Sequence, residues 1–304
     1  MKILVTGGRG VVGKPLSEEL KRRGHQVWIA DCMHSHELDY FRFDVSEFHQ
    51  VERILTQQDF DYVYHLAAEF GRRNGEDFYE NLWKTNAIGT KNVIRMQERL
   101  KFRMIFFSSS EVYGDYRDVM YEDVMDKEAI KQMNDYAMSK WVNEMQILNS
   151  TNSFNTETVR VRLFNTYGPG EYYSDYRSVI CLFIYRALHN MPYTVYKAHK
   201  RTSSYIDDTV RTLANIVDNF KPGEVYNIAG SELHDMKQAS DIILDYLGKD
   251  DSLVEYKDRQ EDTTLLKMVD TSKAIRDLEH KSTVSLADGI PKTIEWQKGV
   301  YGID

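Results

Sequence analysis

The stretch Lys2-Ile-Leu-Val-Thr-Gly-Gly-Arg-Gly-Val-Val-Gly13 opens the chain and decides how it folds. Its aliphatic beginning predicts a short buried strand, its glycines predict a turn, and the residues from Lys14 to Arg23 have the pattern of a helix. In such a turn the backbone approaches a pyrophosphate closely, and free N–H groups at the helix start face its charge. The order therefore predicts a dinucleotide-binding loop. The loop residues expected to contact the dinucleotide are Gly7, Gly10, Val11, Val12 and Gly13.

Asp31 stands 18 residues beyond Gly13, at the end of a second predicted strand, 26–30. A carboxylate at this point accepts hydrogen bonds from the ribose hydroxyls of adenosine and repels a 2′-phosphate. The sequence therefore predicts NAD, and not NADP, as the cofactor. Arg9, inside the loop, is a cation that could partly offset this repulsion.

Strands and helices alternate along the first half of the chain. Further strands are predicted at 40–43, 62–66, 103–107 and 157–164. Helices are predicted at 47–57 with Ser46 as its N-cap, at 80–100, and around Tyr136. This alternation predicts an α/β fold with a Rossmann-like, doubly wound parallel sheet.

The order of predicted strands and helices changes after Asn165. Helical patterns now alternate with short strands such as 225–228, and they lie at 179–189, 208–218, 236–247 and 285–297. We expect an NAD-binding Rossmann domain over 1–165, to which later segments return. Residues 166–304 would mainly form a smaller, mixed α/β substrate-binding lobe.

Bulk properties exclude several classes of protein. The 304 residues carry a net charge of −8, and no stripe of Lys and Arg offsets it, which argues against nucleic-acid binding. Two distant cysteines, Cys32 and Cys181, make neither a disulfide scaffold nor a zinc motif, so no metal is expected. No apolar run reaches the roughly 18 residues of a membrane span. We expect a cytoplasmic protein.

Tyr136 and Lys140 stand four residues apart, on one face of a predicted helix. An ammonium beside the phenol would favour the phenolate and lower a pKa that is normally near 10. Upstream, Ser108-Ser-Ser110-Glu111 follows a strand whose carboxyl end should face the nicotinamide. A serine there can donate to a sugar oxygen and share its proton with Tyr136.

These residues resemble the extended short-chain dehydrogenase/reductase family, in its group of nucleotide-sugar epimerases and dehydratases. The resemblance covers nearly the whole chain. It is carried by Thr6–Gly13, Asp44-Val45, His65–Ala68, Thr85–Thr90, Ser108–Gly114, Tyr136–Lys140, Arg162–Pro169, Arg201–Asp208, Tyr226–Gly230, Arg259–Asp262 and Ser285–Gly289.

The resemblance implies a role for each matching residue. Ser109 is implied as the catalytic serine, Tyr136 as the base, and Lys140 as its partner, which also holds the nicotinamide ribose. Further cofactor contacts are implied for Asp44, Val45, Leu66, Ala67, Ala68 and Asn86. Residues implied to bind the substrate diphosphate are Asn165, Arg201 and Arg259, and guanidinium groups suit phosphate geometry. The implied substrate is a nucleotide-diphosphate sugar, oxidised to a transient 4-keto sugar by NAD.

Three outcomes of the keto intermediate are open: epimerisation, dehydration and decarboxylation. Glu111, two positions after Ser109, places a carboxylate where it could reach C5 or C6 of a sugar and resembles dehydratases and decarboxylases. Ser110 stands where dTDP-glucose dehydratases carry aspartate. The chain length suits a 4-epimerase, which is the favoured hypothesis. An alternative of another class is a non-catalytic NAD-binding regulatory protein.

Two loops and two helices complete the sequence-based hypotheses. The acidic insertion 115–134 and the loop 69–74 are expected to border the sugar pocket, where Arg72 or Arg73 could meet a carboxylate or phosphate. The helices 80–100 and 136–150 resemble those that pair across a twofold axis, which implies a homodimer. The apolar residues proposed for that face are Trp83, Ile88, Ile94, Trp141 and Met145.

Overall fold

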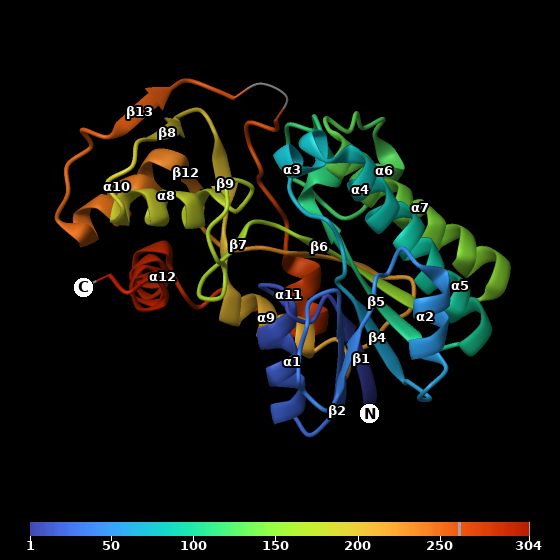
Figure 1. Ribbon diagram of the computed structural model, residues 1–304. Coiled ribbons are helices and arrows are strands. Elements are labelled where there is room, and N and C mark those ends of the chain that lie inside the picture. The colour runs from blue at the N-terminus through green and yellow to red at the C-terminus, as the bar shows by residue number, and fades with distance from the viewer. Residues whose placement is uncertain (261–262, 304) are drawn as a thin grey trace.

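A computed structural model describes residues 1–260 and 263–303, so the last two residues of the segment Arg259–Asp262 lie outside the described part. A parallel sheet with the strand order β11-β6-β5-β4-β1-β2-β3 forms its centre (Figure 1). The strands are β1 (Lys2–Thr6), β2 (Gln26–Asp31), β3 (Tyr40–Arg42), β4 (Tyr62–His65), β5 (Arg103–Ser109), β6 (Thr158–Leu163) and β11 (Val225–Ile228). The predicted doubly wound α/β fold is confirmed.

Both faces of the sheet are covered, which fits the apolar runs Ile3–Val5 of β1 and Met104–Phe107 of β5. On one face Ile3 and Val5 of β1 pack with α1 (Gly13–Arg22), α9 (Ile206–Ala214) and α11 (Ser272–Leu278). On the other face Leu4 packs with α2 (Phe48–Leu55), α5 (Thr90–Leu100) and α7 (Asp135–Phe154). Figure 1 shows these two helical layers on either side of the strands.

The predicted helix 80–100 is not a regular α-helix. It begins as α4 (Tyr79–Trp83), passes through a π-helical turn (Lys84–Gly89) and continues as α5. Gly89 sits so close to the preceding loop that a Cβ would lie 2.7 Å from the Cγ1 atom of Val45. The wider turn rotates the residues after it, so that Ile94 faces the core and not the surface.

Local differences from the predicted boundaries affect site residues. Strand β2 includes Asp31 and strand β5 extends to Ser109, so both side chains are fixed by a strand end. The prediction that Ser46 caps α2 is wrong, because Glu47 is the N-cap residue and the Ser46 hydroxyl donates to the Asp44 carboxylate at 2.7 Å. The 3-10 turn Ser110–Tyr113 and the short helices α3 (Arg72–Asp77) and α6 (Val124–Lys127) lie near the sheet edge.

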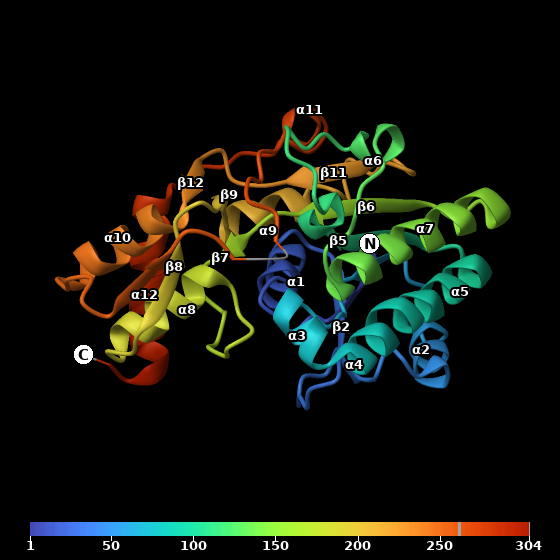
Figure 2. The same cartoon turned by 90° about the horizontal axis from the view of Figure 1, so that it is seen from above.

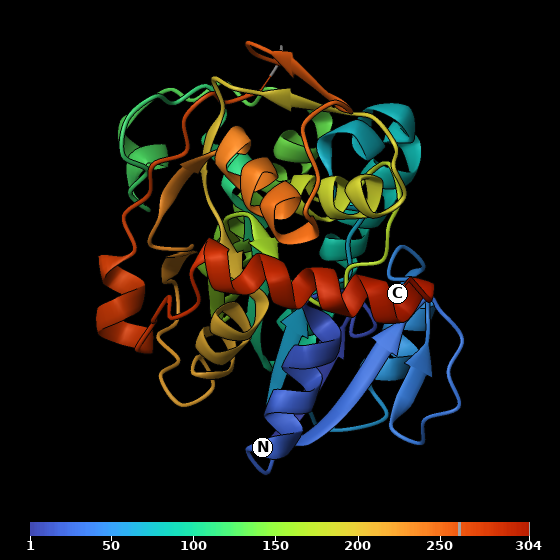
Figure 3. The ribbon, with the colours of Figure 1, turned by 90° about the vertical axis from the view of Figure 1, so that its left-hand side faces the viewer.

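A second group of elements follows β6. The helices α8 (Val179–Leu188), α10 (Met236–Leu247) and α12 (Leu286–Tyr301) share a separate apolar core. Figures 1 and 3 show them beside the sheet, with α12 crossing below the other two. Short strand pairs complete this part: β7 (Thr166–Tyr167) with β10 (Ser204–Tyr205), β8 (Tyr193–Tyr196) with β13 (Val254–Lys257), and β9 (Lys200–Thr202) with β12 (Leu233–Asp235).

Strand β11 comes from the late part of the chain but pairs with β6 in the central sheet. No helix among the described residues is long and apolar enough to cross a membrane.

Candidate active site

The glycine loop after β1 is packed too tightly for side chains. Gly7 has a φ of 68°, and a Cβ there would lie 2.7 Å from the backbone nitrogen of Ala67. A Cβ on Gly13 would lie 2.2 Å from the carbonyl oxygen of Gly7. The segment after β4 is held against the end of β1, because the Ala67 N–H donates to the Thr6 hydroxyl at 3.2 Å. The loop, Leu66 and Ala67 thus form a bare backbone cradle, which fits a dinucleotide pyrophosphate.

Substitution Gly13→Ala is expected to weaken NAD binding. The new methyl group would have to push the Gly7 carbonyl aside, and overpacking of this kind costs about 1–3 kcal/mol, which corresponds to roughly ten- to hundredfold in affinity. Titration with NAD, followed by calorimetry, measures the loss. Gly299→Ala is the control, because a Cβ there meets nothing within 4 Å. Equal NAD affinity of the two variants would contradict the cradle.

The adenosine end of the predicted cofactor site is polar. The carboxylate of Asp31 is buried and accepts hydrogen bonds from the N–H groups of Arg9 at 3.0 Å and Met33 at 3.2 Å. The guanidinium of Arg9 pairs with Glu37. Because Glu37 neutralises this cation, the repulsion of a 2′-phosphate by Asp31 is preserved.

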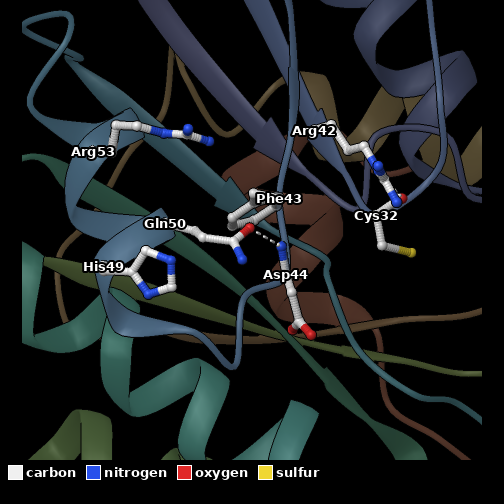
Figure 4. A pocket seen from close by; sticks show the side chains of 7 residues that line it. All are labelled: Cys32, Arg42, Phe43, Asp44, His49, Gln50 and Arg53. Carbon is white, nitrogen blue, oxygen red and sulfur yellow. Dashed lines mark hydrogen bonds between the residues drawn. The ribbon is translucent and has the colours of Figure 1, made fainter.

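Beyond Asp31 lies a cavity of about 520 Å³ (Figure 4). Gln50 accepts a hydrogen bond from the Asp44 N–H at 2.9 Å, which holds the loop after β3, and Val45 is buried beneath it. This is where the sequence predicts the adenine contacts. The lining residues are Cys32, Arg42, Phe43, Asp44, His49, Gln50 and Arg53.

The structure brings Ser109, Tyr136 and Lys140 together from β5 and α7. Helix α7 is capped by Asn134, whose side chain accepts from the Ala137 N–H at 2.8 Å. The Ser109 side chain lies close enough to Tyr136 to lower the pKa of its phenol. The Nζ atom of Lys140 lies 5.9 Å from the centre of the Tyr136 ring and donates to the Phe107 carbonyl at 2.8 Å.

The prediction that Lys140 makes Tyr136 acidic is wrong. Burial raises the pKa of Tyr136 to about 12; the Ser109 hydrogen bond opposes this rise and the Glu111 charge adds to it. Burial also lowers the pKa of Lys140 to about 8. Lys140 donates one N–H to the Phe107 backbone carbonyl. Its position one helical turn from Tyr136 is therefore not sufficient to stabilise a phenolate.

Lys267 is a site residue that the sequence did not indicate. It is 1% exposed, and its Nζ donates to Glu111 at 2.5 Å and to the Ser110 hydroxyl at 3.1 Å. Burial alone would raise the pKa of Glu111, but the charges of Lys267 and Arg72 outweigh it and lower that pKa to about 2. Burial lowers the pKa of Lys267 to about 8, against the charge of Glu111. Near neutral pH the two groups form an ion pair.

Backbone hydrogen bonds hold the chain in place at Lys267 and at the residue after it. Its N–H donates to the Lys200 carbonyl at 3.1 Å, and the neighbouring Met268 carbonyl accepts from the Met120 N–H at 2.9 Å. The insertion 115–134 thus packs against the segment that carries Lys267. No spacing or motif around Lys267 signals this contact, which joins residues 156 positions apart.

The three predicted diphosphate ligands lie in different environments. Arg201 is buried, its guanidinium donates to the Lys200 and Leu265 carbonyls, and burial lowers its pKa to about 10. Asn165 is half-buried, and its backbone carbonyl accepts a hydrogen bond from the Ser204 N–H. Arg259 is exposed. Arg72, from the loop 69–74, donates to Gln260 at 3.3 Å, and its charge acts on Glu111.

Asn86 connects two segments of the candidate site through hydrogen bonds of its side-chain amide. It is fully buried in the π-helical turn, accepts from the Glu69 N–H, and donates to the Glu69 carbonyl and the Ser139 hydroxyl. Its amide thus joins the strand end after β4 to helix α7. Ala68 lies between Ala67 and this anchored Glu69, half-buried at the same edge.

Residues 3–229 match the family model described as the NAD dependent epimerase/dehydratase family. UDP-glucuronic acid decarboxylase 1 of Arabidopsis thaliana is 28% identical, over 97% of this chain and 69% of that protein. A UDP-N-acetyl-alpha-D-glucosaminuronate decarboxylase of Bacillus cytotoxicus is 28% identical over 97% of both chains. The structure of UDP-glucuronic acid 4-epimerase from Bacillus cereus, in complex with UDP-glucuronic acid and NAD, has a TM-score of 0.89 and 25% identity, covering 99% of this chain and 100% of that one.

Proposed function

Because the chain belongs to the NAD-dependent epimerase/dehydratase family, we propose that it oxidises C4 of a nucleotide-diphosphate sugar bearing a C6 carboxylate and then releases that carboxylate as carbon dioxide. The observation that carries this proposal is the buried ion pair between Glu111 and Lys267 beside Ser109 and Tyr136. A simple 4-epimerase needs no second acid–base pair at the reacting carbons.

The oxidation uses Ser109, Tyr136 and Lys140. NAD, held by the loop Gly7–Gly13 and by Asp31, supplies the acceptor for the C4 hydride. Tyr136 removes the proton of the C4 hydroxyl, while Ser109 donates a hydrogen bond to the same oxygen. Burial raises the pKa of Tyr136 to about 12, so in the protein alone the tyrosine is protonated, and it can accept the C4 proton only after its own proton has left to solvent.

The second step follows from the position of the new ketone. A C4 ketone is β to the C6 carboxylate, so the C5–C6 bond breaks with its electron pair moving into a C4–C5 enolate. Lys267 and Arg72 are the cations that would hold the carboxylate, and Glu111 keeps Lys267 in its ammonium form. A proton then returns to C5, and hydride returns to C4.

Epimerisation at C4 is the second candidate. The chain length and the similarity to a UDP-glucuronic acid 4-epimerase favour it. In that reaction the keto sugar turns over and accepts the hydride on its other face, with the carboxylate retained. A 4,6-dehydratase is the least supported outcome, because Ser110 replaces the expected aspartate and donates no proton of suitable acidity.

A panel of nucleotide sugars with and without a C6 carboxylate tests the proposal. Product masses and NMR ring couplings are read after incubation with NAD. Loss of carbon dioxide from the uronic substrates alone supports decarboxylation, and unchanged mass with altered couplings supports epimerisation. If no nucleotide sugar changes and none produces absorbance of reduced nicotinamide, the chain is a non-catalytic NAD-binding protein, and the proposal is wrong.

The division into a cofactor part, 1–165, and a mainly substrate-binding part, 166–304, remains a proposal, as does cytoplasmic residence. Both cysteines are free, Cys32 exposed and Cys181 buried, which is compatible with a reducing compartment.

A homodimer through α5 and α7 is also proposed. Ile88 and Met145 are exposed at 55% and 44%, and Leu148 is exposed near them on α7. Two residues proposed for the face point inward instead: Ile94 lies in the core, and Trp141 packs on the cluster that contains Tyr113. Figure 2 shows α4, α5 and α7 side by side along one edge of the molecule.

Ile88→Glu is expected to shift the protein from dimer to monomer, because a carboxylate would be buried at the interface without a partner. Sedimentation equilibrium at micromolar concentration measures the mass. Ile275→Glu on α11 is the matched control, since Ile275 is also 55% exposed. A wild-type protein that sediments as a monomer would contradict the dimer.

A further inference from the structure

Glu144 lies on α7 one turn beyond Lys140 and is completely buried. Its carboxylate accepts hydrogen bonds from four donors. The Arg162 guanidinium donates twice, at 2.8 and 2.9 Å, the Ser108 hydroxyl donates at 2.5 Å, and Arg160 donates at 3.3 Å. A buried carboxylate with this many charged donors is an anchor between elements, since any loosening leaves charges unpaired.

The anchor extends through the sheet. Arg162 on β6 also donates to the Tyr113 hydroxyl and to the Glu122 carbonyl, both at 2.9 Å. Tyr113 donates in turn to Asn227 on β11 at 2.8 Å. Glu144 therefore ties α7 to β5 and β6 directly and to β11 through Tyr113.

Three consecutive residues of β5 meet three residues of α7 spaced four apart. The Phe107 carbonyl accepts from Lys140, the Ser108 hydroxyl donates to Glu144, and the Ser109 side chain lies close enough to Tyr136 to lower its pKa. The reacting pair and the lysine are thus held by the same strand and helix that Glu144 locks together.

We propose that Glu144 is a positioning residue for the oxidation step: it fixes α7 against β5 so that Tyr136 reaches Ser109, and it supplies the negative charge that faces Lys140. The inference rests on the proposed use of Tyr136 and Lys140. It holds for decarboxylation and epimerisation alike, because both begin with the same oxidation.

The charges around Lys140 favour this role. On its own helix it faces Tyr136 and Glu144; from β4 it faces His65, whose pKa burial lowers to about 3, so that the imidazole is neutral. Burial lowers the pKa of Lys140 to about 8, and the charge of Glu144 opposes that fall. Behind Glu144 stand the guanidinium groups of Arg160 and Arg162. Without Glu144, Lys140 would face two cations and no anion.

Glu144→Gln is therefore expected to lower the pKa of Lys140 by about one unit or more. The lysine is then an ammonium only at lower pH, so the alkaline limb of the turnover profile moves to lower pH. The pKa is measured on the protein without substrate, by NMR of ¹³Cε-labelled lysine, with Lys140→Met to assign the signal. An unchanged pKa of Lys140 in Glu144→Gln would overturn the proposal.

The matched control is Glu98→Gln. Glu98 on α5 is also nearly buried, pairs with Lys91 and Arg95, and accepts from a serine hydroxyl, that of Ser150 at 3.1 Å. Its loss is expected to leave the Lys140 titration and the pH profile unchanged. A shift of the same size in this control would reduce Glu144 to a general structural residue and refute the proposal.

If Glu144→Gln does not fold, two variants that leave Glu144 in place still test the proposal. Arg160→Gln removes a cation behind Glu144, so the pKa of Lys140 should rise; no rise would count against the proposal. Ser108→Ala removes one anchor bond without changing charge, so kcat should fall about tenfold with unchanged KM and pH limb. Wild-type kcat in this variant would refute the positioning role.

Failure of the proposed function and failure of this inference are distinguishable. If wild-type protein converts no nucleotide sugar but the Lys140 pKa shifts as expected in Glu144→Gln and Arg160→Gln, only the proposed function is lost. If the protein is active and the titration does not respond, only the role of Glu144 is lost.

Discussion

Tyr136→Phe is expected to lower turnover of the nucleotide sugar by about 10³-fold or more, the size typical of a lost general base. The hydroxyl beside Ser109 disappears, while the half-buried ring on α7 stays. NAD affinity and thermal stability should therefore remain near wild type. Absorbance of reduced nicotinamide after addition of substrate measures the first step directly, without reference to the later product.

Tyr246→Phe is the control for this experiment. Its hydroxyl also has one partner, Glu295 at 3.1 Å, but the side chain is exposed on α10. This variant should oxidise the sugar at the wild-type rate. A Tyr136→Phe protein with full activity would remove the tyrosine from the mechanism.

The second large effect is expected at Glu111 and Lys267. Glu111→Gln leaves Lys267 as a buried charge without its carboxylate, which costs about 3–5 kcal/mol of unfolding free energy; Lys267→Met should cost less, because Glu111 is partly exposed and still faces Arg72. The double variant has neither charge, so most of that stability should return. Release of carbon dioxide should nevertheless fall about 10²–10³-fold in all three, because Lys267 is either absent or has lost the Glu111 charge that keeps it an ammonium.

The two readouts separate folding from chemistry. Urea denaturation gives the stability of the two single variants and the double variant, and trapped carbon dioxide gives the reaction. Lys257→Met is the control, because its partner Glu255 and Lys257 itself are both half-exposed or more and such a pair contributes less than about 1 kcal/mol. A double variant that releases carbon dioxide at the wild-type rate would exclude the ion pair from the reaction.

The sheet and the cofactor loop could be predicted because their signals are local. The strand before Gly7, the spacing of the glycines and the acidic end of β2 each occupy a few consecutive residues. That Ser109 and Tyr136 act together could be inferred from the place of Ser109 at a strand end that faces the cofactor and from the family resemblance. These parts depend on backbone periodicity, which a sequence displays directly.

The rest depends on packing between distant segments. Lys267 reaches Glu111 only because its backbone lies between Lys200 and Met120, and no pattern in residues 263–270 indicates that arrangement. The raised pKa of Tyr136 reflects burial by the folded chain, whereas helical spacing indicates only which side chains are neighbours. The π-helical turn before α5 was hidden for the same reason, since a Cβ on its Gly89 would lie 2.7 Å from Val45, a residue of a distant segment.

The residues assigned to the two proposed steps come from different parts of the chain, and this has an evolutionary consequence. Tyr136 and Ser109 belong to the sheet and its helix, whereas Lys267 arrives on a late segment that adds no strand to that sheet. Exchange of the segment that carries Lys267 could change which product forms from an oxidised sugar. Ser109 and Tyr136, which are proposed to carry out the oxidation, would stay unchanged. Diversification of products on one scaffold would then require few substitutions, none of them where folding is decided.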